Sequence, residues 1–157
     1  MQRLEVVRGR LTDALADEIL AFWSAHGALV EEVGRQRLPE VVCVLRDGGG
    51  ELVGVSSVYA DAVPLVGNRR FFVYRRFLAP GRSDEDDERM LVAAFDALDR
   101  EGAPTGAPGG LCVFVDDPET MRRHPEAVWP DTEMLYAGYL PDGRQVRIRY
   151  FADAHIL

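Results

Sequence analysis

The hydrophobic pattern is clearest in residues 68–100, where a strand-like run precedes a helix-like one. Residues that favour strands recur from Phe71 to Leu78, and the run ends at Ala79-Pro80-Gly81, because proline lacks the amide hydrogen that strand pairing needs. Apolar residues then return at helical spacing, at Met90, Leu91, Ala94, Phe95 and Leu98. The pattern predicts a strand, a kink, a charged loop and a helix.

The same criteria predict the other elements. Strands are expected at Leu4–Val7, Val41–Leu45, Leu52–Tyr59, Leu111–Val115, Glu133–Leu140 and Gln145–Phe151. Helices are expected at Asp13–Ala25 after a Thr12 cap, at Leu29–Arg37, and from Pro118. Loops are expected at Asp61–Asn68 and Glu101–Gly110. The last strand alternates apolar residues with Arg147 and Arg149, which predicts that one of its faces is exposed.

The start of the central helix is unusually acidic. Ser83 is positioned to cap this helix, with Asp86 three residues later in a capping-box arrangement. Five consecutive carboxylates follow Ser83, from Asp84 to Glu88. They lie at the positive end of the predicted helix dipole.

The strand–kink–loop–helix unit and the element order resemble the GNAT N-acyltransferase superfamily, over nearly the whole chain. The resemblance implies an α/β (α+β) fold with a mixed, mostly antiparallel central sheet flanked by helices. The family loop reads Arg/Gln-x-x-Gly-x-Gly/Ala and holds the pyrophosphate of acetyl-CoA at a helix N-terminus. In one register the matching positions are Ser83, Asp86 and Glu88; shifting to Arg82 places Glu85 and Asp87 at the glycines. In both registers acids replace the glycines, so we expect an altered donor loop and weak coenzyme A binding.

The resemblance also implies candidate site residues. Backbone groups at Phe77, Leu78 and Ala79 would hold the pantetheine, and Arg82 and Ser83 would contact the pyrophosphate. Relatives use a glutamate or an ordered water as base and a tyrosine as acid. Glu31 and Tyr136 are the candidates here, although Tyr136 follows the helix on which the family tyrosine usually lies. Acetyl-CoA or another acyl-CoA is the implied cofactor, and a small-molecule amine is the implied acceptor.

Composition limits the class of protein. The 157 residues are expected to form one domain, and a net charge of −8 argues against nucleic-acid binding, which needs a basic surface. The sequence has no apolar run long enough to span a membrane and no signal-peptide pattern, so we expect a cytoplasmic protein without a membrane partner. Cys43 and Cys112 lie in apolar runs and are expected to be buried free thiols, and no metal-ligand spacing is present.

Three functions are compatible with these residues. The first is transfer of an acyl group from acyl-CoA to a small amine, with an altered donor site. The second is a non-catalytic binding or scaffold protein that kept the fold and lost coenzyme A. The third is a relative that uses an acyl-carrier-protein donor, although carrier proteins are acidic and this chain is too. The sequence leaves the acceptor and the oligomeric state open.

Overall fold

The computed structural model describes residues 2–102 and 106–154, which form a mixed α/β fold. The strands are β1 Arg3–Val6, β2 Val41–Arg46, β3 Leu52–Val63, β4 Arg69–Leu78, β5 Gly110–Val115, β6 Leu135–Tyr139 and β7 Gln145–Tyr150. The α-helices are α1 Asp13–Ala25, α2 Glu31–Arg37, α3 Asp84–Arg100 and α4 Pro118–Arg123. No helix in the described ranges is long and apolar enough to cross a membrane.

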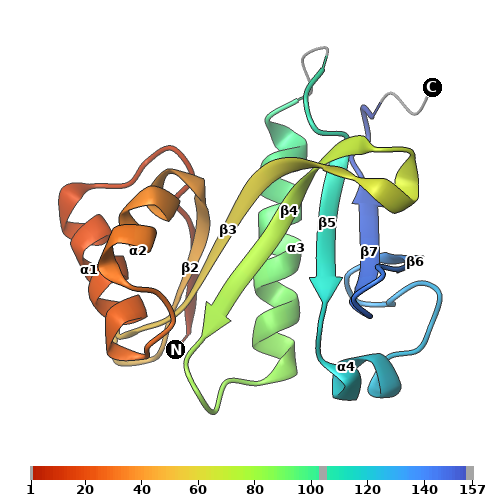
Figure 1. Cartoon of the computed structure of the whole chain (residues 1–157). Coiled ribbons are helices and arrows are strands. Elements are labelled where there is room, and N and C mark those ends of the chain that lie inside the picture. The colour runs from red at the N-terminus through yellow and green to blue at the C-terminus, as the bar shows by residue number, and fades with distance from the viewer. Residues whose placement is uncertain (1, 103–105, 155–157) are drawn as a thin grey trace. The chain divides into compact units, whose positions relative to one another are not determined.

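Seven strands pair in the order β1-β2-β3-β4-β5-β7-β6 (Figure 1). The pairs β1–β2, β2–β3, β5–β7 and β6–β7 are antiparallel. The β4–β5 pair is parallel, with Phe72 opposite Leu111 and Val73 opposite Cys112. The mixed, mostly antiparallel sheet confirms the expectation from the sequence.

The chain divides into two compact units. The first contains Met1–Val58 and Arg75–Ala97, and the second contains Tyr59–Tyr74 and Leu98–Leu157. The chain passes from one unit to the other within β3, within β4 and within α3. The single domain expected from the sequence stays a prediction.

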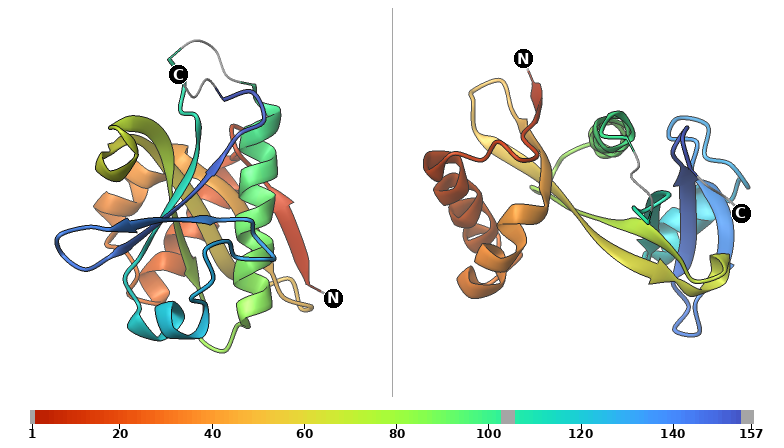
Figure 2. Two further views of the ribbon diagram at one scale, coloured as in Figure 1. Left: turned by 90° about the vertical axis from the view of Figure 1, so that its right-hand side faces the viewer. Right: turned by 90° about the horizontal axis from the view of Figure 1, so that it is seen from above.

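In the first unit, α1 and α2 lie on the same side of β2 and β3 (Figure 2). The Thr12 hydroxyl caps α1 by accepting a hydrogen bond from the Leu15 amide at 3.1 Å, as predicted. The helical spacing then directs Ile19, Phe22 and Trp23 into a core with Val41, Val44, Leu52 and Val55.

Helix α3 packs on the other face of the same strands. Its Met90 is fully buried against Leu45 and Val53, whose side chains alternate with those that face α1. The predicted apolar stripe is confirmed, since all five of its residues are buried: Met90, Leu91, Ala94, Phe95 and Leu98. The stripe faces the core because it recurs at helical spacing between charged positions.

The second unit has a separate core that contains Val63, Phe71, Cys112, Val146 and Ile148. The prediction that one face of β7 is exposed is wrong for Arg147, whose side chain is only 1% exposed. Its guanidinium lies 4.3 Å from the centroid of the Trp129 ring, and its Nε donates to Gln145 Oε1 at 2.9 Å. A planar guanidinium can be buried in this way when it stacks on an aromatic ring and its N–H groups find acceptors.

Several boundaries differ from those predicted. Strand β3 continues to Val63, and a 3-10 helix covers Pro64–Val66. Most of the expected loop Asp61–Asn68 is therefore regular secondary structure. Val63 is fully buried, and this tertiary packing is the reason that β3 extends. Helix α2 begins at Glu31 instead of Leu29. Residues 103–105 of the expected connector lie outside the described residues.

Candidate functional site

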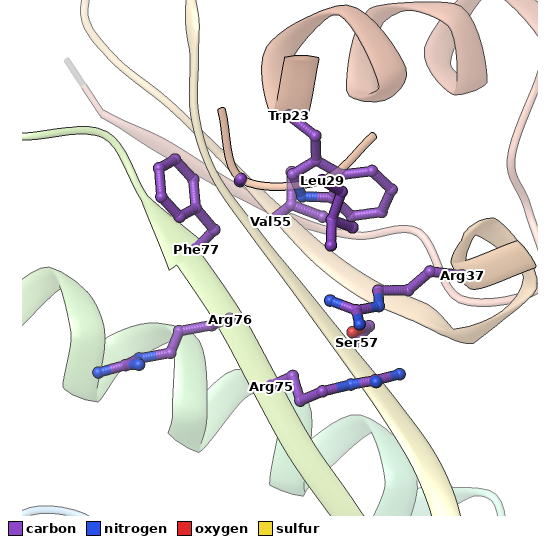
Figure 3. A pocket seen from close by; sticks show the side chains of 9 residues that line it. Trp23, Leu29, Arg37, Val55, Ser57, Arg75, Arg76 and Phe77 are labelled. Carbon is purple, nitrogen blue, oxygen red and sulfur yellow. The ribbon is translucent and has the colours of Figure 1, made fainter. Parts of the chain in front are cut away.

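A cavity of about 300 Å³ lies in the first unit, between the α1–α2 segment and the strands β3 and β4 (Figure 3). Its volume is at the lower end of the range typical of small-molecule sites. It is lined by Trp23, Ala28, Leu29, Arg37, Val55, Ser57, Arg75, Arg76 and Phe77. Residues of α1, α2, β3 and β4, and of the segment between α1 and α2, therefore form its wall.

One part of the cavity wall is apolar and rigid. Trp23 is 3% exposed and belongs to the α1 core, as does Val55 of β3. Phe77 packs its ring against Phe22, with centroids 5.6 Å apart in an edge-to-face arrangement. The His26 ring lies 5.7 Å from the Phe77 ring, measured between centroids. These contacts hold the aromatic side chains in place before any ligand binds.

The other part of the wall is cationic. Arg37 ends α2, and Figure 3 shows its guanidinium next to Ser57 and on the same side of the strands as Arg75. Arg75 Nη2 lies 2.7 Å from Glu40 Oε1. Arg76 points to the opposite side, where its Nε and Nη2 bind the two carboxylate oxygens of Asp87 at 2.8 and 2.9 Å. The alternation of side chains along β4 explains this division.

The backbone groups at the end of β4 point to two different edges. The Ala79 amide donates to the Val53 carbonyl at 2.8 Å, so this amide belongs to the pairing with β3. Because backbone groups alternate along a strand, the Leu78 amide and carbonyl face the edge away from β3. The Leu78 side chain packs with Leu45, Val53 and Met90. Of the three predicted backbone positions, Leu78 is therefore the one whose amide and carbonyl point away from β3, and its contact with a ligand stays a prediction.

The start of α3 has the predicted cap. The Ser83 hydroxyl accepts a hydrogen bond from the Asp86 amide at 3.2 Å. The Asp86 carboxylate is buried, accepts from Gln2 Nε2 at 3.1 Å and lies 3.9 Å from Arg89. Together with the Asp87–Arg76 pair, these contacts partly offset the negative charge at the start of the helix.

Arg82 immediately precedes the capping serine. Its Nε is buried, and no protein atom in the described ranges accepts a hydrogen bond from it. A buried donor without an acceptor is costly, and a phosphate oxygen is an acceptor that a guanidinium binds well. This orphaned donor fits the phosphate of an acyl-CoA at the start of α3.

The two predicted catalytic residues lie in different units. Glu31 is the first residue of α2, and its exposed carboxylate pairs with Arg35 at 2.7 Å. It is not among the residues that line the cavity. Tyr136 lies on β6, is 45% exposed, and has its ring centroid 5.7 Å from that of Tyr139. The catalytic roles of both residues stay predictions.

The arginines of the cavity were missed by reading the sequence. Arg75 and Arg76 interrupt an apolar strand, and a pair of charges inside such a run was the available signal. Arg37 gave no such signal, because arginine is common in the last turn of a helix. Only the fold brings Arg37 to Ser57 and Arg75.

Sequence similarity to known proteins covers only part of the chain. No family model matches the chain. A stretch of 105 residues, 67% of the chain, is 35% identical to a 3-dehydroquinate synthase of Rhodococcus opacus, but it spans only 24% of that protein.

Solved structures match nearly the whole chain. A GNAT-family acetyltransferase from Streptococcus agalactiae has a TM-score of 0.60 at 9% identity, with 95% of each chain covered. A phosphinothricin acetyltransferase from Sinorhizobium meliloti in complex with acetyl-CoA has a TM-score of 0.62 at 12% identity, covering 99% of this chain and 91% of that one. An N-acyl amino acid synthase from uncultured soil microbes has a TM-score of 0.56 at 13% identity, covering 96% and 91%. The chain therefore has the fold of the GNAT acetyltransferases.

Proposed function

We propose that the chain is an N-acyltransferase that moves an acyl group from an acyl-CoA to a small amine, with an altered donor site. The observation that carries this proposal is the cavity of about 300 Å³ beside the end of β4, in a chain with the GNAT fold. A cavity of this size suits a small molecule. The matching stretch of the Rhodococcus 3-dehydroquinate synthase is only a quarter of that protein, so its activity does not enter the proposal.

The donor would be held by backbone and cationic groups near α3. The Arg82 guanidinium and the Ser83 region would contact the phosphates, and the outward-facing Leu78 amide would donate to the thioester carbonyl. The bound acyl-CoA supplies an acyl group activated as a thioester. The family glycines are absent, so the backbone approaches the phosphates less closely than in a glycine-rich loop. This difference is the reason that we describe the donor site as altered.

The chain's own residues orient the acceptor and handle its proton. The cavity wall at Trp23, Val55 and Phe77 excludes water around the amine. Glu31 is the proposed base for the amine proton. We expect Glu31→Gln to lower kcat more than it changes KM.

The acidic start of α3 favours a second candidate. Four acidic residues occupy its first turn, and like charges repel a pyrophosphate. A protein that binds no coenzyme A would then use the cavity for binding alone, or would take its acyl group from a carrier protein. The net charge of −8 opposes the carrier alternative, because carrier proteins are acidic as well.

An acyl-transfer assay tests the proposal. Purified protein, acetyl-CoA and a mixture of small amines should release free thiol, and mass spectrometry should find the acetylated amine. Arg82→Met should raise the KM for acetyl-CoA without changing the KM for the amine. The control is Arg122→Met, because Arg122 lies on α4, exposes 74% of its side chain and pairs with Glu119. No amine-dependent thiol release with acetyl-CoA or with longer acyl-CoAs would overturn the proposal.

A further inference from the structure

The cavity that we assign to the acceptor has a marked charge imbalance. Of its three lining arginines, Arg37 and Arg75 lie on the same side of the strands as Ser57 and Arg76 points to the other side (Figure 3), and none of the nine lining residues is an aspartate or glutamate. The carboxylates that pair with Arg75 and Arg76 belong to Glu40 and Asp87, which do not line the cavity. A ligand in this cavity therefore meets positive charge on its wall, and this arrangement favours an anion over a second cation.

The cationic and hydroxyl groups of the wall lie together, apart from its apolar side chains. Arg37, Arg75 and the Ser57 hydroxyl gather on one side of the strands, as Figure 3 shows. A guanidinium presents a planar fork that matches the two oxygens of a carboxylate, and it can serve more than one acceptor at once. The Glu40 ion pair holds the Arg75 side chain in one orientation. Its binding geometry is therefore set before a ligand arrives.

The apolar wall lies next to this cationic group. Trp23 and Val55 are buried in the core around α1, and the rings of Phe22 and His26 support Phe77. Leu29 completes the apolar wall. An aliphatic or aromatic side chain fits such a surface, whereas a strongly hydrophilic one does not.

We propose that the acceptor is an amino acid with an apolar side chain. Its carboxylate binds Arg37 and Arg75, its side chain packs on Trp23 and Phe77, and its amino group is the nucleophile. This inference rests on the proposed function and specifies its substrate class. In the transfer, the amino nitrogen bonds to the acyl carbon, the carbon–sulfur bond breaks with its electron pair on sulfur, and the proton lost from nitrogen balances the thiol released.

Binding of the acceptor without any donor gives a test that does not depend on catalysis. Titration calorimetry compares L-phenylalanine with phenethylamine, and L-leucine with 3-methylbutylamine, because each pair differs only in the carboxylate. We expect each amino acid to bind about 10- to 100-fold more tightly than its amine, since hydrogen bonds to a charged group have this strength. This comparison uses the unaltered protein, so it does not require any variant to fold.

Variants then locate the carboxylate. Arg37→Met and Arg75→Met should each weaken amino-acid binding by about 10- to 100-fold and leave amine binding unchanged. Arg37→Lys should restore part of the loss, because lysine keeps the charge without the fork. Arg122→Met is the matched control and should bind like the unaltered protein.

The outcomes separate this inference from the proposed function. Tight amino-acid binding without acyl transfer would support the proposed amino-acid binding site and overturn the acyltransferase. Acyl transfer to both members of each pair, with equal affinities, would support the acyltransferase and overturn the inference. The absence of binding by both amino acids would also overturn the inference.

Discussion

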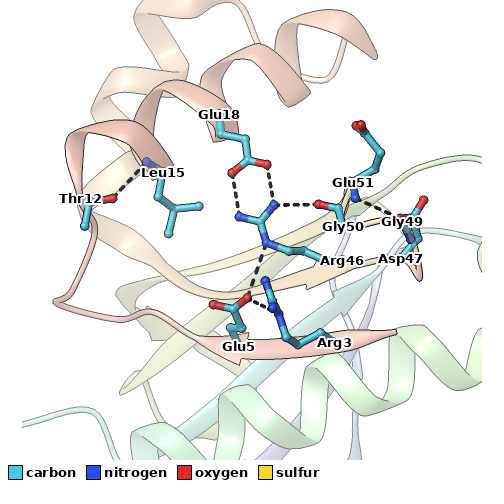
Figure 4. A network of polar contacts seen from close by, with 10 residues as sticks. All are labelled: Arg3, Glu5, Thr12, Leu15, Glu18, Arg46, Asp47, Gly49, Gly50 and Glu51. Atoms are coloured by element: carbon cyan, nitrogen blue, oxygen red, sulfur yellow. Dashed lines mark hydrogen bonds and ion pairs between the residues drawn. The ribbon is translucent and has the colours of Figure 1, made fainter. Parts of the chain in front are cut away.

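At the scale of single residues, Arg46 organises a polar network between β2 and α1 (Figure 4). Its Nη2 donates to Glu18 Oε1 at 2.7 Å, and its Nε lies 3.5 Å from Glu5 Oε1. Glu5 also pairs with Arg3 at 2.7 Å. The Arg46 hydrogen bond is the main cause that lowers the pKa of Glu18, ahead of an opposing effect of burial. The network links β1, β2 and α1 by charge as well as by packing.

The lowered pKa of Glu18 makes its contribution to stability depend on pH. A carboxyl whose pKa is lower in the folded protein stabilises it above the unfolded pKa, which is about 4.3 for glutamate. The contribution is lost as the pH falls through the folded pKa. Since the Glu18 side chain is 39% exposed, solvent screening limits the effect to about 1 kcal/mol or less.

We therefore expect Glu18→Gln to lower the free energy of unfolding at pH 7 by up to about 1 kcal/mol. The difference from the unaltered protein should shrink as the pH falls below about 4.3, as Glu18 becomes protonated. Urea unfolding curves at several pH values measure this difference. A difference that stays constant down to pH 3 would show that the lost carboxylate is not the cause.

The two cysteines should be unreactive in the folded protein. Burial raises the pKa of the Cys43 thiol to about 11 and that of Cys112 to about 12, and both side chains are fully buried. Because the thiolate is the reactive form, neither cysteine should react with a thiol reagent at pH 8, and both should react in denaturant. Rapid labelling of the native protein would show that one of the two cores opens readily.

At the scale of elements, the start of α3 depends on Ser83. Its hydroxyl accepts from the Asp86 amide, so Ser83→Ala should cost about 0.5–2 kcal/mol of unfolding free energy. Denaturant unfolding measures the loss. The control is Ser24→Ala, because Ser24 is exposed in the last turn of α1 and should change stability by less than about 0.5 kcal/mol. Equal stability of both variants would mean that the cap contributes nothing.

The packing of α3 on β3 depends on a glycine. A Cβ added at Gly54 would lie 2.6 Å from Leu78 Cδ2 and 2.9 Å from the Met90 sulfur. We expect Gly54→Ala to cost about 1–3 kcal/mol, because the end of β4 and the first turns of α3 must shift. Gly49→Ala is the control, since its Cβ would meet only Asp47 Oδ1 at 3.4 Å. A thermal melt of Gly54→Ala that matches that of Gly49→Ala would contradict this packing.

At the scale of the whole molecule, the element order was the part of the fold that the sequence predicted well. Helix α3 illustrates the reason, since its cap and apolar stripe are local signals, and both are confirmed. The end of β3 was predicted four residues early, because it depends on burial of Val63 by elements distant in sequence. Arg147 was wrongly predicted to be exposed for a related reason, because Trp129, on which its guanidinium stacks, lies on a different segment.

The site was less predictable than the fold. The resemblance pointed to the strand end and the helix start, which are adjacent in sequence. The cavity instead assembles α1, α2, β3 and β4, and its cationic wall exists only after these elements pack. Asp86 shows the same limitation, because the sequence identified its position at the helix start but gave no sign that its carboxylate is buried against Gln2.

The acidic start of α3 determines how tightly the donor should bind. The Asp86 and Asp87 carboxylates already contact cationic or amide groups, so an exposed carboxylate such as that of Glu85 is the better one to remove. Neutralising it by Glu85→Gln should tighten acetyl-CoA binding about 2- to 5-fold, given the usual strength of a charge at a helix end. Glu51→Gln removes one exposed charge on the β2–β3 turn and is the control.

The central claim is that an acyl-CoA binds to this chain as the acyl donor, and calorimetric titration with acetyl-CoA tests it most directly. We predict a saturable binding heat with one site per chain, weaker for Arg82→Met and tighter for Glu85→Gln. The heat for Arg122→Met and Glu51→Gln should match that of the unaltered protein. The absence of any saturable heat, in the unaltered protein and in Glu85→Gln alike, would contradict the claim.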